Sequence, residues 1–157
     1  MSMFLKLGDI RGESLAVGFE GQIEVRTFAY GASQPLAPVR GEGAQMVMAR
    51  AVHRPLKIQK LSDRSTPGLC QALWEGRLLP EAVLTVCADG PDGLTPYLVI
   101  TLGQVLLADY QLAGSGSLPL ESLSLNYSRI EVSYLPALET GDGPVSAAFD
   151  LNAAGEG

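Results

Sequence analysis

Few side chains in this sequence could do chemistry, and they lie far apart. The chain has one histidine, His53, which stands beside Arg54 and Pro55 in a basic stretch. A lone imidazole cannot build a multi-histidine metal site, and as a general base it needs a nucleophile within hydrogen-bond reach. We therefore interpret His53 as a hydrogen-bonded structural residue.

The two cysteines, Cys70 and Cys87, predict neither a disulfide framework nor a zinc site. They are 17 positions apart, a spacing that matches no zinc motif. Cys70 falls on the apolar face of an expected helix, and Cys87 falls in an expected strand. We interpret both as core residues, with thiols that a cytosolic environment keeps reduced.

Three loops have the composition of a site without its context. Ser115 and Ser117 lie in a GSGS loop that lacks the strand–serine–helix turn of a nucleophile. The DGPDG segment at 89–93 has two carboxylates, but its spacing suits a hairpin turn and not a calcium loop. The GEG segment at 41–43 is not followed by the Lys-Ser or Lys-Thr of a phosphate-binding loop. The sequence thus predicts that the protein is not an enzyme and holds no metal and no cofactor.

The elements that would position these residues are mostly strands. Apolar and polar residues alternate along 21–31 as in a strand, and both faces carry apolar groups. Pro55 interrupts a second extended segment, and we expect a bend or bulge at Gly103 in a third. The expected strands cover residues 4–7, 21–31, 46–61, 82–88, 94–114, 121–136 and 145–151.

One helix is expected over residues 63–77. Ser65 or Thr66 can serve as its N-cap, Pro67 suits the first helical position, and Gly76 can end it. The helix is too short to be stable alone, so it must pack on a sheet. The residues expected to be buried at that contact are Leu69, Leu73 and Trp74.

These elements predict a mainly β fold, a closed β-barrel of two packed sheets with one short α-helix on its side. The length of 157 residues suits one domain, which we expect to span 1–150 with a flexible C-terminal tail at 151–157. No apolar run approaches the roughly 18 residues of a membrane span, so we expect no membrane insertion. The first residues show no signal-peptide pattern, which indicates a cytoplasmic protein that is secreted, if at all, without a cleaved signal.

The charge balance argues against nucleic acid as a partner, because phosphate binding needs clustered Lys and Arg. The net charge is −6 and the isoelectric point is about 4.7. Residues 25–64 carry seven basic groups and two acidic ones, whereas 65–157 carry two basic groups and eleven acidic ones. Either this segregation is chance, or one face of the fold is basic and another acidic, which would suit self-association.

The segment 32–45 is expected to be a loop, because it has no periodicity and is longer than most connections in a compact domain. Pro35 and Pro38 stiffen it, which lowers the entropy lost when it is held extended. Arg40 adds a positive charge. A stiff, exposed loop of this length usually has a partner.

Four blocks of the sequence carry a more specific signal. They are MFLKLGDIRGES at 3–14, HRPLKIQKLSDRSTPGL at 53–69, YLVITLGQVLLADY at 97–110 and LNYSRIEVSYLP at 125–136. In order and spacing they resemble the Hcp family, the tube proteins of bacterial type VI secretion systems. The resemblance extends from residue 3 to about 150, and its most specific piece is the opening block with Gly-Glu-Ser at 12–14.

The resemblance implies a β-barrel with one helix, assembled as a six-membered ring. Rings of this family stack into a tube inside a contractile sheath, with a spike protein at the tip, and the lumen can hold small effector proteins. The chain departs from the family at Phe28-Ala29-Tyr30, where many members carry tryptophans, and its 32–45 loop is rich in proline instead of glycine. Some relatives carry a fused toxin domain, and we expect no such activity here.

Two functions follow from the resemblance. Either the protein is a structural tube subunit, or its ring serves mainly as a secreted carrier or chaperone for a cognate effector. Its expected partners are copies of itself, the sheath, the spike and small effectors. We expect ring-to-ring contacts from Gln34, Pro35, Pro38, Val39, Arg40 and Glu42. The strand expected to contribute to the lumen or to the contact between subunits contains Arg26, Phe28, Ala29 and Tyr30.

Overall fold

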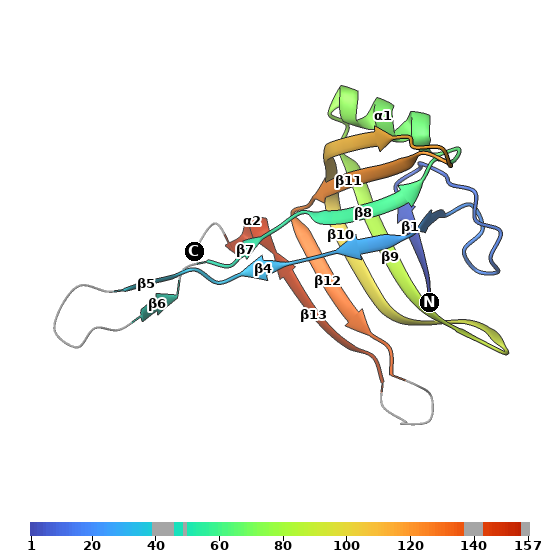
Figure 1. The fold of residues 1–157 in the computed structure, drawn as a ribbon. Coiled ribbons are helices and arrows are strands. Elements are labelled where there is room, and N and C mark those ends of the chain that lie inside the picture. The colour runs from blue at the N-terminus through green and yellow to red at the C-terminus, as the bar shows by residue number, and fades with distance from the viewer. Residues whose placement is uncertain (39–45, 49, 137–142, 155–157) are drawn as a thin grey trace.

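The structure of the protein is a computed structural model that describes residues 1–38, 46–48, 50–136 and 143–154. Figure 1 shows a mainly β chain with helix α1 (Thr66–Glu75) on its side and a single helical turn, α2 (Leu151–Ala154), directly after the last strand. The strands of the large sheet are β1 (Ser2–Leu7), β2 (Ile23–Val25), β3 (Thr27–Ala29), β8 (Leu56–Leu61), β9 (Leu79–Gly90), β10 (Gly93–Ala113), β11 (Leu120–Asn126), β12 (Arg129–Tyr134) and β13 (Val145–Asp150).

These nine strands pair in the order β2-β1-β9-β10-β11-β8-β3, with β12 beside β10 and β13 beside β12. The two ends of this order, β2 and β3, are consecutive in the chain. Arg26 lies between them, and its backbone N–H donates to the carbonyl of Gln59 on β8 at 2.8 Å. Among the described strands, however, no sheet closes on itself. The expected mainly β fold with two sheets and one short helix on its side is confirmed, whereas closure of the barrel is not.

Strand β10 is 21 residues long and belongs to both sheets. Its first half pairs with β12 as far as Gly103, and its second half pairs with β11 from Leu106 onward. Between them Gln104 has a positive φ of 53°, which residues other than glycine rarely adopt. The irregularity expected at Gly103 therefore lies one residue further along, where the strand passes from one sheet to the other.

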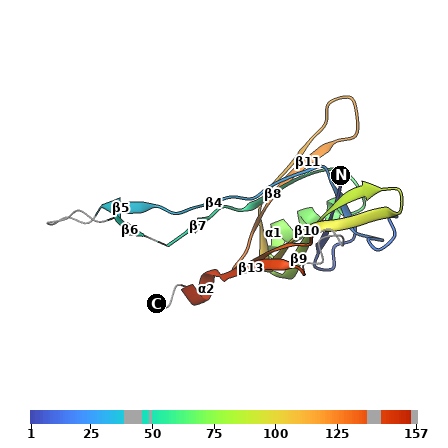
Figure 2. The ribbon, with the colours of Figure 1, turned by 90° about the horizontal axis from the view of Figure 1, so that it is seen from below.

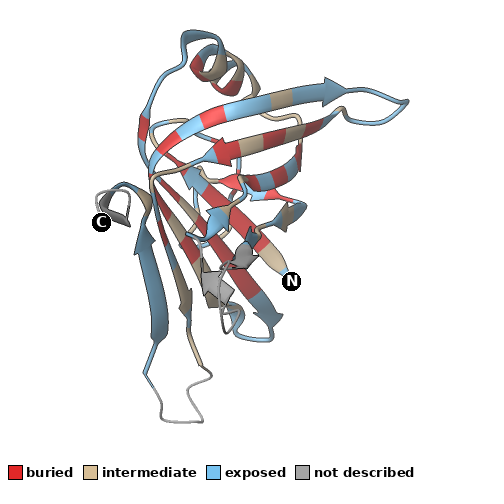
Figure 3. Cartoon of the chain, turned by 90° about the vertical axis from the view of Figure 1, so that its left-hand side faces the viewer, coloured by how far each residue is buried: buried red, intermediate tan, exposed pale blue. Residues whose placement is uncertain are grey.

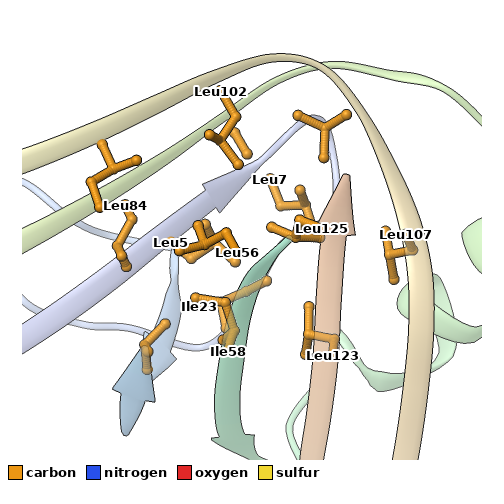
Figure 4. Packing of buried hydrophobic residues seen from close by; sticks show 14 of the residues in the cluster. Leu5, Leu7, Ile23, Leu56, Ile58, Leu84, Leu102, Leu107, Leu123 and Leu125 are labelled. Atoms are coloured by element: carbon orange, nitrogen blue, oxygen red, sulfur yellow. The ribbon is translucent and has the colours of Figure 1, made fainter. Parts of the chain in front are cut away.

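The apolar core lies between the two sheets. Figure 3 shows buried and exposed residues alternating along the strands, because successive side chains point to opposite faces. On β8, Leu56 and Ile58 are buried, whereas Lys57 and Gln59 are exposed. Burying each such Leu or Ile stabilises the fold by about 1.5–3 kcal/mol. The members of the core labelled in Figure 4 are Leu5, Leu7, Ile23, Leu56, Ile58, Leu84, Leu102, Leu107, Leu123 and Leu125.

Helix α1 begins and ends at the residues that the sequence indicated, although it is shorter than 63–77. Ser65 is the N-cap and Pro67 lies in the first turn, but the Ser65 hydroxyl donates to Asp63 instead of capping the helix backbone. Gly76 ends the helix in the left-handed conformation, with a φ of 61°. Glycine adopts this conformation without the steric cost of a side chain.

The prediction that Trp74 is buried against the sheet is wrong for the single chain. Leu69 and Ala72 are buried and Leu73 is half-buried against the core, but Trp74 is 75% exposed. At 3.6 residues per turn, Trp74 lies about 140° around the helix axis from Leu69. The helix covers the sheet with a narrow face, so a side chain at that angle points away from it.

Four short strands form an arm that extends away from the large sheet, as Figure 1 and Figure 2 show. They are β4 (Ala32–Ser33), β5 (Leu36–Pro38), β6 (Met46–Met48) and β7 (Val52–His53). Strand β4 pairs with β7, and β5 pairs with β6. The arm therefore contains two strands, β4 and β5, in a segment where the sequence predicted only a loop. We use "arm" below for these four strands and the described residues that join them.

Two other segments that were expected to be single strands are divided. The segment 46–61 forms β6, β7 and β8, with a break at Pro55 as expected. The segment 121–136 forms β11 and β12, and Ser128 between them donates its N–H to the carbonyl of Gly103 at 3.1 Å. Because β11 and β12 pair with different halves of β10, the chain must change sheets at this point.

Candidate assembly interface

The arm joins the sheets through a group of aromatic rings around the single histidine. The hydroxyl of Tyr30 lies 3.1 Å from His53 Nδ1, and the rings of His53 and Phe149 stack with their centroids 5.2 Å apart. Tyr127 approaches the imidazole edge-on, and its hydroxyl donates to the carbonyl of Arg54 at 2.9 Å. The expectation that His53 is a hydrogen-bonded residue is confirmed.

The residues expected to make ring-to-ring contacts belong to the arm. Gln34 and Pro35 are exposed between β4 and β5, and Pro38 is the last residue of β5. Val39, Arg40 and Glu42 lie outside the described residues. Contacts between two rings by this group therefore stay a prediction.

The strand expected at the lumen or at a subunit contact has residues of two kinds. Phe28 and Tyr30 are half-buried and pack against the core, whereas Arg26 and Ala29 are exposed. Ala29 borders a shallow groove of about 350 Å³ that crosses β3, β8, β10 and β11. The polar residues that line this groove are Thr27, Lys57, Gln59, Asp109, Gln111, Ser122 and Ser124.

Large apolar side chains are exposed at two other places. Tyr134 and Val145 stand opposite each other on β12 and β13, and both are exposed. Trp74 near the end of α1 and Leu78 just after it are also exposed. Contiguous apolar surface of this kind marks sites of contact with other molecules.

The Gly-Glu-Ser motif of the opening block has a structural role. A Cβ at Gly12 would lie 2.6 Å from the carbonyl oxygen of Gln22, so the backbone can pass there only as glycine. Ser14 is buried, and its N–H donates to the same carbonyl at 3.1 Å. The carboxylate of Glu13 accepts the N–H of Arg64 at 2.9 Å, which ties this loop to the segment before α1.

Sequence reasoning missed a buried polar group beneath α1. Lys60 and Glu121 form an ion pair, and Lys60 Nζ also lies 3.1 Å from Asp63 Oδ1. The hydroxyls of Thr66 and Tyr110 donate to the Glu121 carboxylate. Burial and this carboxylate raise the pKa of Tyr110. A signal was present, because both charged residues occupy core-facing positions in strands that alternate apolar and polar residues.

The residues with reactive side chains are mostly apart. Among the residues that the structure describes, no three His, Cys, Asp or Glu side chains gather as metal ligands would. Cys87 is buried in the core, and burial raises the pKa of its thiol. Cys70 is only half-buried, and Ser115 and Ser117 are exposed. The helices described include none that is long and apolar enough to cross a bilayer.

Comparison with known proteins assigns the family. The family described as "Type VI secretion system effector, Hcp" matches residues 4–134. Protein hcp1 of Pseudomonas aeruginosa is 31% identical over 156 residues, which cover 96% of this chain and 95% of that protein. The chain therefore belongs to the Hcp family of type VI secretion, and the resemblance carried by the four sequence blocks is confirmed.

Solved structures have the same fold. The structure of a type six secretion system protein gives a TM-score of 0.86 at 24% identity, with 97% of this chain and 96% of that chain covered. The crystal structure of Hcp1 from Salmonella typhimurium gives 0.77 at 22% identity, with 97% and 95% covered. Hcp is a family of structural secretion proteins and not of enzymes, which agrees with the expectation of no catalysis.

Proposed function

We propose that the protein is a structural tube subunit of a type VI secretion system, forming hexameric rings that stack head to tail and are expelled with the spike. The observation that carries this proposal is the arm (Figure 1, Figure 2), which projects away from the core. Two-stranded ribbons are at best marginally stable in water, so the arm needs a partner that covers it. Membership of the Hcp family suggests that a neighbouring ring is this partner.

Within one ring, we infer that adjacent copies cover the exposed apolar side chains. Trp74 and Leu78 offer one such surface, and Tyr134 with Val145 offers another. A contact between two different surfaces of the same chain is heterologous, and it gives a ring where the rotation closes. The uneven distribution of basic and acidic residues along the chain supports a contact of this kind.

The folded subunit is, in this proposal, one closed barrel domain over residues 1–150. Strand β2 pairs with β1, and β3 pairs with β8, so two consecutive strands reach the two edges of the sheet order. The hydrogen bond from Arg26 to Gln59 supports their action as one continuous strand. The C-terminal tail, 151–157, then starts with α2 and remains flexible beyond it.

The groove across β3, β8, β10 and β11 is our candidate for the wall of the lumen. Its polar lining is mostly neutral, with Lys57 and Asp109 as its two charged residues. Such a wall allows a polypeptide to pass without strong binding. The same groove favours the alternative function, a ring-shaped secreted carrier or chaperone for a cognate effector, because Gln59 and Gln111 offer hydrogen bonds to a bound protein.

The partners in this proposal are other copies of the chain, the contractile sheath, the spike protein and small effectors. The protein assembles in the cytoplasm and is secreted without a cleaved signal peptide. The net charge of −6 disfavours nucleic acid as a partner.

Native mass spectrometry of the purified protein at micromolar concentration tests the ring, and electron microscopy of the same sample tests stacking. We expect hexamers in the first measurement and tubes of stacked rings in the second. A sample of monomers would contradict both functions. Hexamers that remain single rings and retain a bound effector would favour the carrier.

A further inference from the structure

We propose that the C-terminal strand β13 sets the direction of the arm, through the ring of Phe149 and the carbonyl of Leu151. This inference rests on the proposed function, because it assigns a control to the surface through which rings would stack. It makes Phe149 a positioning residue for the arm.

Two contacts join the arm to this distant part of the chain. Arg50, which precedes β7, donates from Nη2 to the carbonyl of Leu151 at 3.1 Å. His53, at the end of β7, stacks on Phe149 with 29° between the ring planes. Because these two contacts flank β7, they fix both the position and the direction of that strand relative to β13.

The opposite side of His53 is held by the sheets. Tyr30 lies within hydrogen-bond distance of Nδ1, and Tyr127 contacts the ring edge-on with centroids 6.3 Å apart. The Nε2 atom is buried and has no hydrogen-bond partner. The imidazole is therefore clamped between the tyrosines on one side and Phe149 on the other, and loss of Phe149 would leave it held from one side only.

Strand β13 is suited to such a control because of its place in the fold. It pairs with β12 and with no other described strand, and all six of its residues are exposed. An edge strand has free backbone groups that can bind a partner, and it opens more easily than a central strand. A partner that displaces β13 would move Phe149 and Leu151 together and would release the arm from its direction.

Limited proteolysis with trypsin tests the clamp in dilute, unstacked protein. The measured quantity is the rate of cleavage after Arg50, because Arg54 is followed by proline and is not cut. Phe149→Ala should raise this rate by up to about tenfold, since a stacked aromatic pair stabilises by up to about 1.5 kcal/mol. Phe149→Tyr keeps the ring and should be cut at the wild-type rate. Val145→Ala, at the other end of β13, is the matched control.

The result is independent of whether rings stack. Cleavage of a folded Phe149→Ala variant at the wild-type rate, or equally fast cleavage of Val145→Ala, overturns the inference. If Phe149→Ala does not fold, Phe149→Leu replaces it, because leucine retains apolar volume but offers no aromatic face. If the wild-type protein never stacks, the tube function fails while the cleavage rates still decide whether β13 holds the arm.

Discussion

Lys60 and Glu121 stand directly opposite each other on β8 and β11, and both side chains are completely buried. Helix α1 joins this pair through Thr66, whose hydroxyl donates to Glu121 at 3.1 Å. Tyr110 on β10 donates to the other carboxylate oxygen. The ion pair thus connects three strands or helices to β8, and its loss affects more than one contact.

Removing one member of this pair should destabilise the subunit strongly. Glu121→Leu leaves the Lys60 charge buried beside Asp63 alone, and breaking a buried pair in this way costs about 3–5 kcal/mol. Urea unfolding at a fixed protein concentration measures the free energy of unfolding. The double variant Lys60→Met, Glu121→Leu should lose less than the sum of the two single variants.

Lys57→Met is the matched control for this measurement, because Lys57 is exposed on the same strand. It should change the free energy of unfolding by less than about 0.5 kcal/mol. If the losses of the two buried single variants simply add in the double variant, Lys60 and Glu121 do not stabilise the fold as a pair.

The same strand shows what could be predicted from the sequence and what could not. The alternation of Leu56 and Ile58 with polar residues predicted a strand with one buried face, and the structure has it. The alternation also places Lys60 on the buried face, but it cannot supply the partner. The partner follows from the register of β8 on β11, a tertiary property that local periodicity does not contain.

The candidate interface was predictable to a different extent. The helix was predicted from its caps, yet the angle at which it packs decides which residues are buried, and this angle placed Trp74 outside. The aromatic group around His53 could not be predicted, because it joins residues from four distant segments of the chain. The ring-stacking residues came from the resemblance to the Hcp family and not from any pattern in the loop alone.

Trp74→Ala should separate stability from assembly. Trp74 is 75% exposed, so its removal should change the free energy of unfolding of dissociated subunits by less than about 0.5 kcal/mol, as at other surface positions. Leu69→Ala removes a fully buried side chain and should cost about 2–5 kcal/mol. We expect Trp74→Ala to weaken the hexamer in native mass spectrometry. Hexamers as stable as the wild type would exclude Trp74 from the contact between subunits.

Alkaline conditions should destabilise the fold through two tyrosines. Burial is the first cause that raises the pKa of Tyr110 and of Tyr127, and Glu121 raises that of Tyr110 further. The folded state then holds each phenol proton more tightly than the unfolded chain, in which the pKa of tyrosine is about 10. The resulting stability is complete below that pH and is lost as the pH rises above it.

The melting temperature should therefore fall steeply above about pH 10. Tyr110→Phe and Tyr127→Phe together should flatten this dependence, whatever their effect at neutral pH. Tyr134→Phe, at an exposed position, is the control and should leave the slope unchanged. A double variant with the wild-type slope would show that other groups control alkaline unfolding.

Salt should weaken stacking more than ring closure. The basic segment 25–64 includes the arm, whereas acidic residues dominate 65–157, so stacked rings would bring opposite charges together. Exposed charges are screened beyond about 8 Å at physiological ionic strength and at shorter distances in more salt. Light scattering across a salt series should report loss of tubes while native mass spectrometry still reports hexamers. Tubes that lengthen with salt would indicate an apolar contact between rings instead.

Shortening the arm gives the most direct test of its role. Removal of residues 36–42 takes away the outer part of the segment, including Pro38 and Arg40, and adds nothing to the core cavity because the buried cluster contains none of these residues. The contacts of His53 with Tyr30 and Phe149 at the base of the arm remain. The variant should therefore keep the wild-type melting temperature and hexamer mass.

Stacking should nevertheless be lost, because the surface that reaches the next ring is gone. Electron microscopy should show single rings, and the protein should no longer appear in the medium of cells with an active secretion system. An insertion of equal length at 114–117, an exposed loop outside the arm, serves as the control and should still stack. A shortened protein that loses its hexamer would place this segment in the contact within the ring. A shortened protein that still forms tubes would remove the arm from the contact between rings.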